Sequence, residues 1–239
     1  MAKTKKLDLY KEHKAEYVTP KAPVLVEVAP ATYLTIEGQG PPGTEAFQAK
    51  VGALYSVAFT IKMTRKFAGK GDYKVCNLEG LWWVAGKKGT RFVKAPPETW
   101  RWKLMIRVPE FITEHDLEDA KQALLAKKKP PQFTEVELES LEEGCCVQVL
   151  HVGPYADEGP TITAMHDFAK ENGLSFDGLH HEIYLSDPRR VPPERLRTIL
   201  RHPVRRDQRR HSVFATAVDT GGHLGPSRPV TSDAETAYR

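Results

Sequence analysis

The chain has 239 residues, of which 40% are hydrophobic and 28% are charged. This length allows one large domain or two small ones, and this composition is typical of a folded rather than a disordered protein. Much of the formal net charge of +4 lies toward the two ends of the chain, so charge does not indicate a nucleic-acid partner.

The three cysteines, Cys76, Cys145 and Cys146, are odd in number and include no Cys-x-x-Cys pair. They therefore indicate neither a zinc ribbon nor a redox motif, and they predict a protein of the reducing cytoplasm. The N-terminus has no apolar segment of the kind found in secretory signals, and no apolar run approaches the ~18 residues of a membrane span. We expect no membrane partner.

The first half of the chain predicts a strand, a helix and two further strands. Residues 1–22 form a polar, Lys-rich lead-in that is too short for a helix-turn-helix module. Residues 24–37 predict two short strands or one strand bent at Pro30. Thr44 is a suitable N-cap for an amphipathic helix of about five turns, and strands are expected over 73–84 and 99–108.

A connecting helix over residues 113–129 begins at the capping-box pattern Thr113-Glu114-His115-Asp116. Residues 133–141 alternate between polar and apolar side chains and could form an edge strand. The second half then repeats the earlier order, with a strand over 145–152 and a helix that starts at Thr161 and closes at Gly173. Strands over 180–186 and 198–204 follow, and residues 205–239 are expected to form a mobile tail.

The two halves therefore share the order strand-helix-strand-strand, over residues 23–108 and 132–204. We predict an α+β fold in which two such repeats are related by a pseudo-two-fold axis within a domain spanning residues 23–204. Each small sheet would place one face against its own helix, leaving the other face for its partner. A ligand cleft is expected between the two sheets.

Glu182 lies within the predicted strand 180–186, between aromatic and aliphatic neighbours. Ile183 and Leu185 would point to one face, and Glu182 and Tyr184 to the other, because strand side chains alternate. A carboxylate in this position is either solvated on an exposed face or held in a cleft, where burial would raise its pKa. From the strand alone, both interpretations stay open.

Two motifs carry a resemblance to a known family. They are His151-Val152-Gly153-Pro154-Tyr155, and Glu182-Ile183-Tyr184-Leu185-Ser186-Asp187-Pro188. With Val51-Gly52-Ala53-Leu54-Tyr55 and Leu78-Glu79-Gly80-Leu81-Trp82-Trp83, the ordered set resembles the GyrI-like small-molecule-binding family over residues 20–205. It is most similar to a stand-alone bacterial subgroup associated with hydrolysis of cyclopropane-bearing DNA-alkylating natural products.

The resemblance implies an aromatic-walled pocket around a central glutamate, which here is Glu182. Trp82 and Trp83 are adjacent, so one should face the pocket and the other the core. Tyr155 follows a Gly-Pro turn and could equally cap a sheet edge. The candidate walls are Tyr155, Tyr55, Trp82, Trp83, Met105 and Tyr184.

Two functional hypotheses follow. In the first, the protein is a cofactor-independent detoxification enzyme in which Glu182 activates water and Tyr155 donates to a carbonyl oxygen. In the second, it is a non-catalytic module that sequesters or senses flat, aromatic or cationic drugs through cation–π contacts. In both, the partner is a small molecule. The histidines lack metal-ligand spacing, so neither a metal nor a cofactor is predicted.

Overall fold

The computed structural model of the protein describes residues 6–86 and 94–207. The described residues up to Arg206 belong to one compact unit. The predicted tail begins within this unit, because Arg205 and Arg206 are the last residues of a strand, and residues 208–239 of that tail lie outside the described part. Among the described residues, no helix is both long and apolar enough to cross a membrane.

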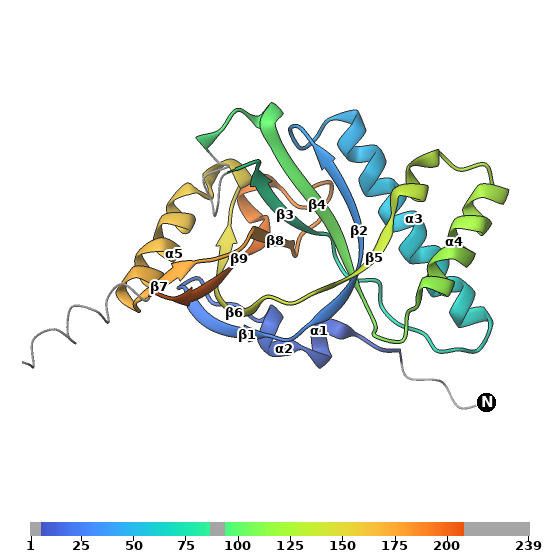
Figure 1. Ribbon diagram of the computed structural model, residues 1–239, viewed down its shortest axis with the longest axis horizontal. Coiled ribbons are helices and arrows are strands. Elements are labelled where there is room, and N and C mark those ends of the chain that lie inside the picture. The colour runs from blue at the N-terminus through green and yellow to red at the C-terminus, as the bar shows by residue number, and fades with distance from the viewer. Residues whose placement is uncertain (1–5, 87–93, 208–239) are drawn as a thin grey trace, which may run out of the picture. The chain divides into compact units, whose positions relative to one another are not determined.

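The fold is α+β and is built on one large antiparallel sheet (Figure 1). The strands run in the order β1-β6-β9-β8-β3-β4-β2-β5, and β7 pairs with β9. Their bounds are β1 Val24–Val28, β2 Ala31–Gln39, β3 Glu79–Val84, β4 Trp100–Val108, β5 Glu137–Leu141, β6 Gly144–Val152, β7 Leu174–Phe176, β8 His180–Tyr184 and β9 Arg197–Arg206.

The two predicted sheets form one continuous sheet. The expectation of a cleft between two separate sheets is therefore wrong. Backbone pairing of β3 with β8 joins the first half of the chain to the second. Each half also lends a strand to the other, since β1 pairs with β6 and β5 pairs with β2. Pairing at the centre leaves no strand edge there, so the halves do not stack face to face.

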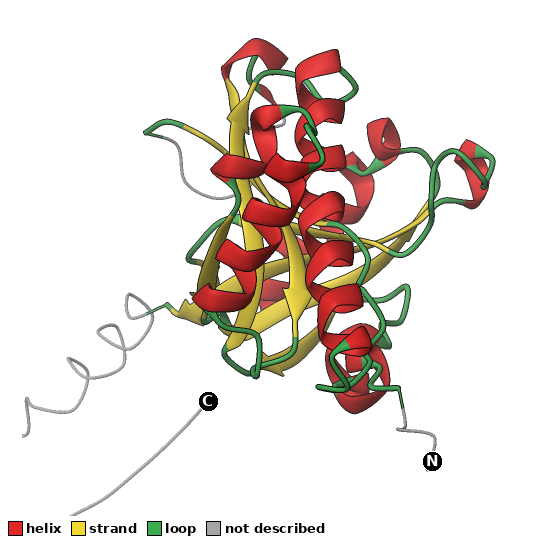
Figure 2. Cartoon of the chain, turned by 90° about the vertical axis from the view of Figure 1, so that its right-hand side faces the viewer, coloured by secondary structure: helices red, strands yellow, loops and turns green. Residues whose placement is uncertain are grey.

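Three longer helices cover one face of this sheet: α3 Glu45–Phe67, α4 Glu114–Ala126 and α5 Gly159–Glu171 (Figure 2). The predicted N-cap Thr44 accepts a hydrogen bond from the backbone N–H of Phe47. The predicted capping box of Thr113 and Asp116 is also present. The third helix begins before Thr161, because its first turn opens with Gly159-Pro160 and proline suits that position.

Sequence and structure differ elsewhere in small ways. Strand β3 starts only at Glu79, and the predicted strand segment 73–78 is irregular apart from one bridge between Leu7 and Tyr73. Residues 131–135 form a 3-10 helix before the edge strand β5. The three-residue β7 was not predicted, because it is too short to give a periodic pattern.

The N-terminal segment packs on the opposite face of the sheet, so the polar lead-in is part of the fold. It contains the short helices α1 Leu9–Glu12 and α2 Lys14–Tyr17, and the side chains of Glu16 and Tyr17 are buried. Tyr17 packs with Ile183 and Ile199 from the centre of the sheet.

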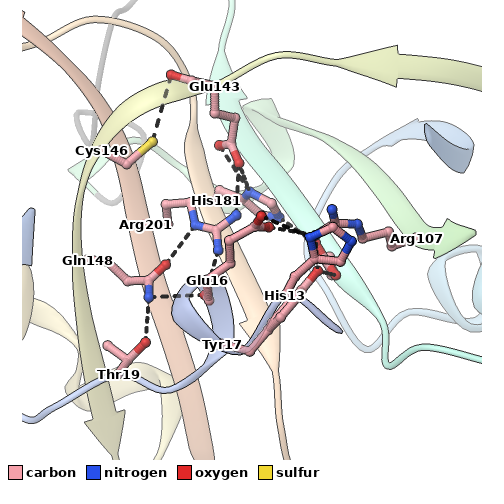
Figure 3. Close-up of polar contacts among 11 residues, drawn as sticks. His13, Glu16, Tyr17, Thr19, Arg107, Glu143, Cys146, Gln148, His181 and Arg201 are labelled. Carbon is pink, nitrogen blue, oxygen red and sulfur yellow. Dashed lines mark hydrogen bonds and ion pairs between the residues drawn. The ribbon is translucent and has the colours of Figure 1, made fainter. Parts of the chain in front are cut away.

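A buried network of polar side chains holds this segment in place (Figure 3). Arg107 donates to Glu16 Oε2 at 2.6 Å, and Arg201 donates to the Glu16 carbonyl oxygen at 2.8 Å. Arg201 also contacts Glu143 at 3.0 Å, and His181 lies 3.0 Å from Glu143 and 3.1 Å from Glu79.

The charges of this network balance. Its three acidic residues, Glu16, Glu79 and Glu143, are paired with three basic residues, Arg107, Arg201 and His181. Burial opposes the charge on His181, but Glu143 and Glu79 outweigh it and raise its pKa to about 9. Burial likewise opposes the charge on Glu143, but His181 and Arg201 lower its pKa to about 2. Each buried charge therefore has a partner.

Candidate functional site

The candidate site lies where the two halves of the sheet meet, on the helix-bearing face. One row of paired residues crosses the sheet there, in the order Ile36, Leu104, Gly80, Glu182, Leu200 and Val149. The first two pack in the apolar cluster that includes α3, and the last two pack in the cluster that includes α5. Glu182 therefore lies near the centre of the row, between residues that pack with α3 and residues that pack with α5. Figure 1 shows β8, the strand that carries it, in the middle of the sheet.

Glu182 is 7% exposed and is oriented by its neighbour two residues along β8. The hydroxyl of Tyr184 donates to Glu182 Oε2 at 2.8 Å and accepts from Trp82 Nε1 at 3.0 Å. Gly80 makes this contact possible, because a Cβ there would lie 3.0 Å from Trp82 Nε1 and 3.3 Å from the Tyr184 hydroxyl. A fixed carboxylate oxygen of this kind suits a general base.

Tyr155 approaches the same group from the turn before α5. Its ring makes an edge contact with Tyr184, with ring centroids 5.7 Å apart, and the residue is 39% exposed. Burial, followed by the negative charges of Glu182 and Glu158, raises the pKa of Tyr155 to about 12. Tyr155 therefore keeps its proton at neutral pH and can donate a hydrogen bond.

Glu158 is a second buried carboxyl group beside Glu182, and the sequence analysis missed it. It is 6% exposed and precedes α5, but its side chain makes no capping hydrogen bond to that helix. Burial, followed by the charge of Glu182, raises its pKa to about 10. An acidic residue before a helix is usually a dipole or capping residue, so its sequence position gave no signal of this role.

His180 completes the polar group. Its Nε2 lies 3.5 Å from Glu182 Oε1, and one ligand-type atom from each of Glu158, His180 and Glu182 lies within 4.8 Å of the others. Two buried carboxyl groups this close require one positive charge between them. Burial and the charge of Glu182 raise the pKa of Glu158 to about 10, which favours a proton on that carboxyl group.

The structure brings together four of the predicted site residues: Glu182, Tyr155, Trp82 and Tyr184. Tyr55 lies at the edge of this group rather than beside Glu182. Burial raises the pKa of the Tyr55 hydroxyl, and this outweighs the lowering by its hydrogen bond with the backbone at Leu78. Leu78 also accepts from the backbone N–H of Tyr184.

Met105 and one of the adjacent pair Trp82 and Trp83 were predicted to line the site, but the structure places neither Met105 nor Trp83 there. They lie on the opposite face of the sheet, in an apolar cluster with Tyr33 and Leu81. The expected cleft was on the helix-free face, whereas Glu182 faces the helices. Because side chains alternate along a strand, this determines which residues of the neighbouring strands share the face of Glu182. Of the adjacent pair, Trp82 is therefore the site residue.

Two cavities lie away from the polar group at the sheet centre. A cavity of about 220 Å³ lies between α3 and residues 129–133, and another of about 330 Å³ lies near Asp8 and Lys74. Neither is lined by Glu182 or its neighbours. The polar group at the sheet centre is thus defined by its buried side chains.

The chain is similar to known proteins in both sequence and fold. The model of the GyrI-like small molecule binding domain matches residues 110–205. An uncharacterized conserved protein from Listeria innocua is 40% identical, covers 84% of this chain and 100% of its own, and superposes with a TM-score of 0.77. This chain belongs to the GyrI-like family.

A hydrolase encoded by lin2189 of Listeria innocua is 39% identical over 84% of this chain and 100% of its own, with a TM-score of 0.76. The EcmrR C-terminal domain, at 12% identity and a TM-score of 0.52, covers 77% of this chain and 97% of its own, and shares the fold alone. No curated protein matches this chain.

Proposed function

We propose that this GyrI-like protein is a cofactor-independent hydrolase that detoxifies cyclopropane-bearing genotoxins. The observation that carries the proposal is Glu182, a carboxylate that is 7% exposed at the centre of the sheet and held by the Tyr184 hydroxyl at 2.8 Å. Similarity to Listeria innocua hydrolases at 38% and 39% identity supports an enzyme. The substrate class follows from the resemblance of the sequence motifs to the cyclopropane-hydrolysing subgroup.

The chemistry requires little beyond these residues. A cyclopropane conjugated to a dienone is strained and electrophilic, and water can open it. Tyr184 holds Oε2 of Glu182, and His180 Nε2 lies 3.5 Å from Oε1. Oε1 is the oxygen we assign to take the proton from that water. Tyr155 donates to the carbonyl oxygen as it becomes a phenolate, and Trp82 and Tyr184 pack against the flat ligand. General base assistance contributes roughly 10²–10⁴-fold.

The strand order supports the repeat interpretation that places the ligand at the sheet centre. From the β3–β8 pair outward, β4 and β9 come next, followed by β2 and β6, and then β5 and β1. The two halves therefore use equivalent strands at equivalent places, which is what a pseudo-two-fold axis between β3 and β8 requires. Glu182 lies beside that proposed axis, and Gly80 is its partner across it.

A non-catalytic drug-binding module is the second candidate. Aromatic rings around a carboxylate also suit an organic cation, through cation–π contacts and charge. Turnover separates the two functions, because a binding module protects only a stoichiometric amount of drug.

The test is to incubate a spiro-cyclopropyl dienone with catalytic amounts of protein. We expect many product molecules per protein molecule and a rate about 10²–10⁴-fold lower for Glu182→Gln. Glu171→Gln, an exposed change at the end of α5, is the matched control and should keep the full rate. If intact ligand binds one-to-one without product, or Glu182→Gln keeps its rate, the hydrolase proposal fails.

A further inference from the structure

Glu158 is a buried acid beside the polar group at the sheet centre. Its Oε1 is fully buried and has no hydrogen-bond partner in the part of the chain that the structure describes. The side chain does not cap α5, although it precedes the first residue of that helix. It points instead to the polar group at the sheet centre, within 4.8 Å of ligand-type atoms of Glu182 and His180.

The surroundings of Glu158 favour its neutral form. The groups that face it are Glu182, His180 and Tyr184 from β8, together with Tyr155 from its own turn. Burial removes water, and the negative charge of Glu182 opposes a second negative charge, so the pKa of Glu158 rises to about 10. A neutral carboxyl group in such a place can donate a hydrogen bond to an acceptor on a ligand.

We propose that Glu158 is a second catalytic residue, which donates a hydrogen bond from its carboxylic acid to a carbonyl oxygen of the ligand. With the Tyr155 hydroxyl it forms a pair of donors for the negative charge that develops on that oxygen. The ligand class is a conjugated ketone whose electrophilic carbon is attacked by water. This inference rests on the proposed function and names the group that stabilises the leaving electron pair.

The step balances within the site. A bond forms between the water oxygen and the cyclopropane methylene carbon, and the bond from that carbon to the ring breaks. The electron pair moves through the ring to the carbonyl oxygen, which takes the proton of Glu158, while Glu182 takes the proton of water. One proton then passes from Glu182 to Glu158, whose carboxyl groups are neighbours, and restores the starting state.

Glu158→Leu and Glu158→Gln separate this role from packing. Removing one such donor should lower kcat by about 10²–10³-fold in the leucine variant, with a smaller change in KM. Glutamine keeps an N–H donor and should restore part of the loss. In the wild type, kcat/KM should fall as pH rises through about 10, and this fall should be absent from Glu158→Gln. Full kcat in both variants, or an unchanged alkaline fall, would overturn the proposal.

Infrared difference spectroscopy tests the donor without turnover. The wild type minus Glu158→Gln should show the C=O stretch of a protonated carboxyl group at pH 7, and the band should shift when the dienone binds. A shift without hydrolysis would contradict the proposed function but keep Glu158 as the donor. If the band is absent, or insensitive to ligand, while hydrolysis proceeds, Glu158 is not the donor. A stoichiometric divalent metal in the purified protein, lost in Glu158→Gln, would also overturn the proposal.

Discussion

His181 and Glu182 are neighbours on β8, yet they face opposite sides of the sheet. The ionisable groups around His181 are paired with opposite charges, whereas Glu182 lies beside a second acid. On the side of His181, three carboxylates and three cations form a closed network, and the pKa of Glu143 falls to about 2. On the side of Glu182, two carboxyl groups lie together, and the pKa of Glu158 rises to about 10. The first arrangement stabilises a fold, whereas the second leaves acid and base groups available for a ligand.

This comparison separates structural from functional burial of charge. Both faces bury ionisable groups almost completely, so burial alone would not distinguish them. The distinguishing feature is whether the protein itself supplies each partner. Glu143 has two, His181 and Arg201, whereas Glu158 Oε1 has none among the described residues.

The largest expected effect comes from unbalancing the network. Arg201→Leu leaves three buried carboxylates with two cations and should lower the free energy of unfolding by about 3–5 kcal/mol. Chemical denaturation measures it. Arg205→Leu, on the same strand but with a side chain that is 66% exposed, should change stability by no more than about 0.5 kcal/mol. Equal effects of the two variants would contradict the structural role of Arg201.

Lowering the pH should destabilise the protein, in part through Glu143 of the same network. The folded-state pKa of Glu143 lies below its ordinary value, so its contribution is present above about pH 4.5 and is lost as pH falls through about 2. This amounts to roughly 3 kcal/mol. His202, next to Arg201 on β9, faces the opposite side of the sheet, beside His180. Burial lowers its pKa to about 3, so the stability that neutral His202 contributes is full above about pH 6.5 and is lost as pH falls toward 3.

Melting temperatures measured between pH 7 and pH 2 test this acid dependence. His202→Phe keeps the ring contact with Phe176 and should flatten the part of the curve between about pH 6.5 and pH 3. An unchanged curve in that range would show that His202 is not the titrating group.

Tyr184→Phe should have an intermediate effect on the other face. The change removes the hydroxyl that donates to Glu182 and accepts from Trp82, so unfolding should become easier by about 1–2 kcal/mol. Hydrolysis should slow as well, because Glu182 loses its fixed orientation. Loss of stability with an unchanged rate would show that Tyr184 does not position the base.

The last expected effect is similar in size to that of Tyr184→Phe but has the opposite sign. The folded-state pKa of Glu158 lies above its ordinary value, so folding near neutral pH requires uptake of a proton, which costs increasing free energy from about pH 4.5 to about 10. Glu158→Gln removes this requirement and should stabilise the protein at pH 7 by about 1–2 kcal/mol. Thermal unfolding measures it, and a less stable variant would contradict the account of this pair.

Local signals were sufficient to predict much of the fold. The Thr44 cap, the capping box at Thr113 and the alternation in residues 99–108 all act within a few residues, and the structure contains each element. The pairing of β3 with β8 could not be predicted in this way, because it joins residues about a hundred positions apart. That single pairing makes one sheet out of two and decides which face carries the site.

The same limit explains the site. The strand alone left the role of Glu182 open, and the family resemblance assigned it to the pocket. Its face depended on tertiary structure, which is why Met105 was misplaced and the choice between Trp82 and Trp83 stayed open. Glu158 precedes a helix, where an acid is ordinary. Only its contact with β8 reveals that it is buried beside a second carboxyl group.

The most direct test of hydrolysis is mass spectrometry of a spiro-cyclopropyl dienone incubated with catalytic protein in water labelled with heavy oxygen. The account predicts a product that has gained one labelled water, in large excess over protein, and that is lost with Glu182→Gln. Intact dienone bound one-to-one, or dienone attached covalently to the protein, would contradict it.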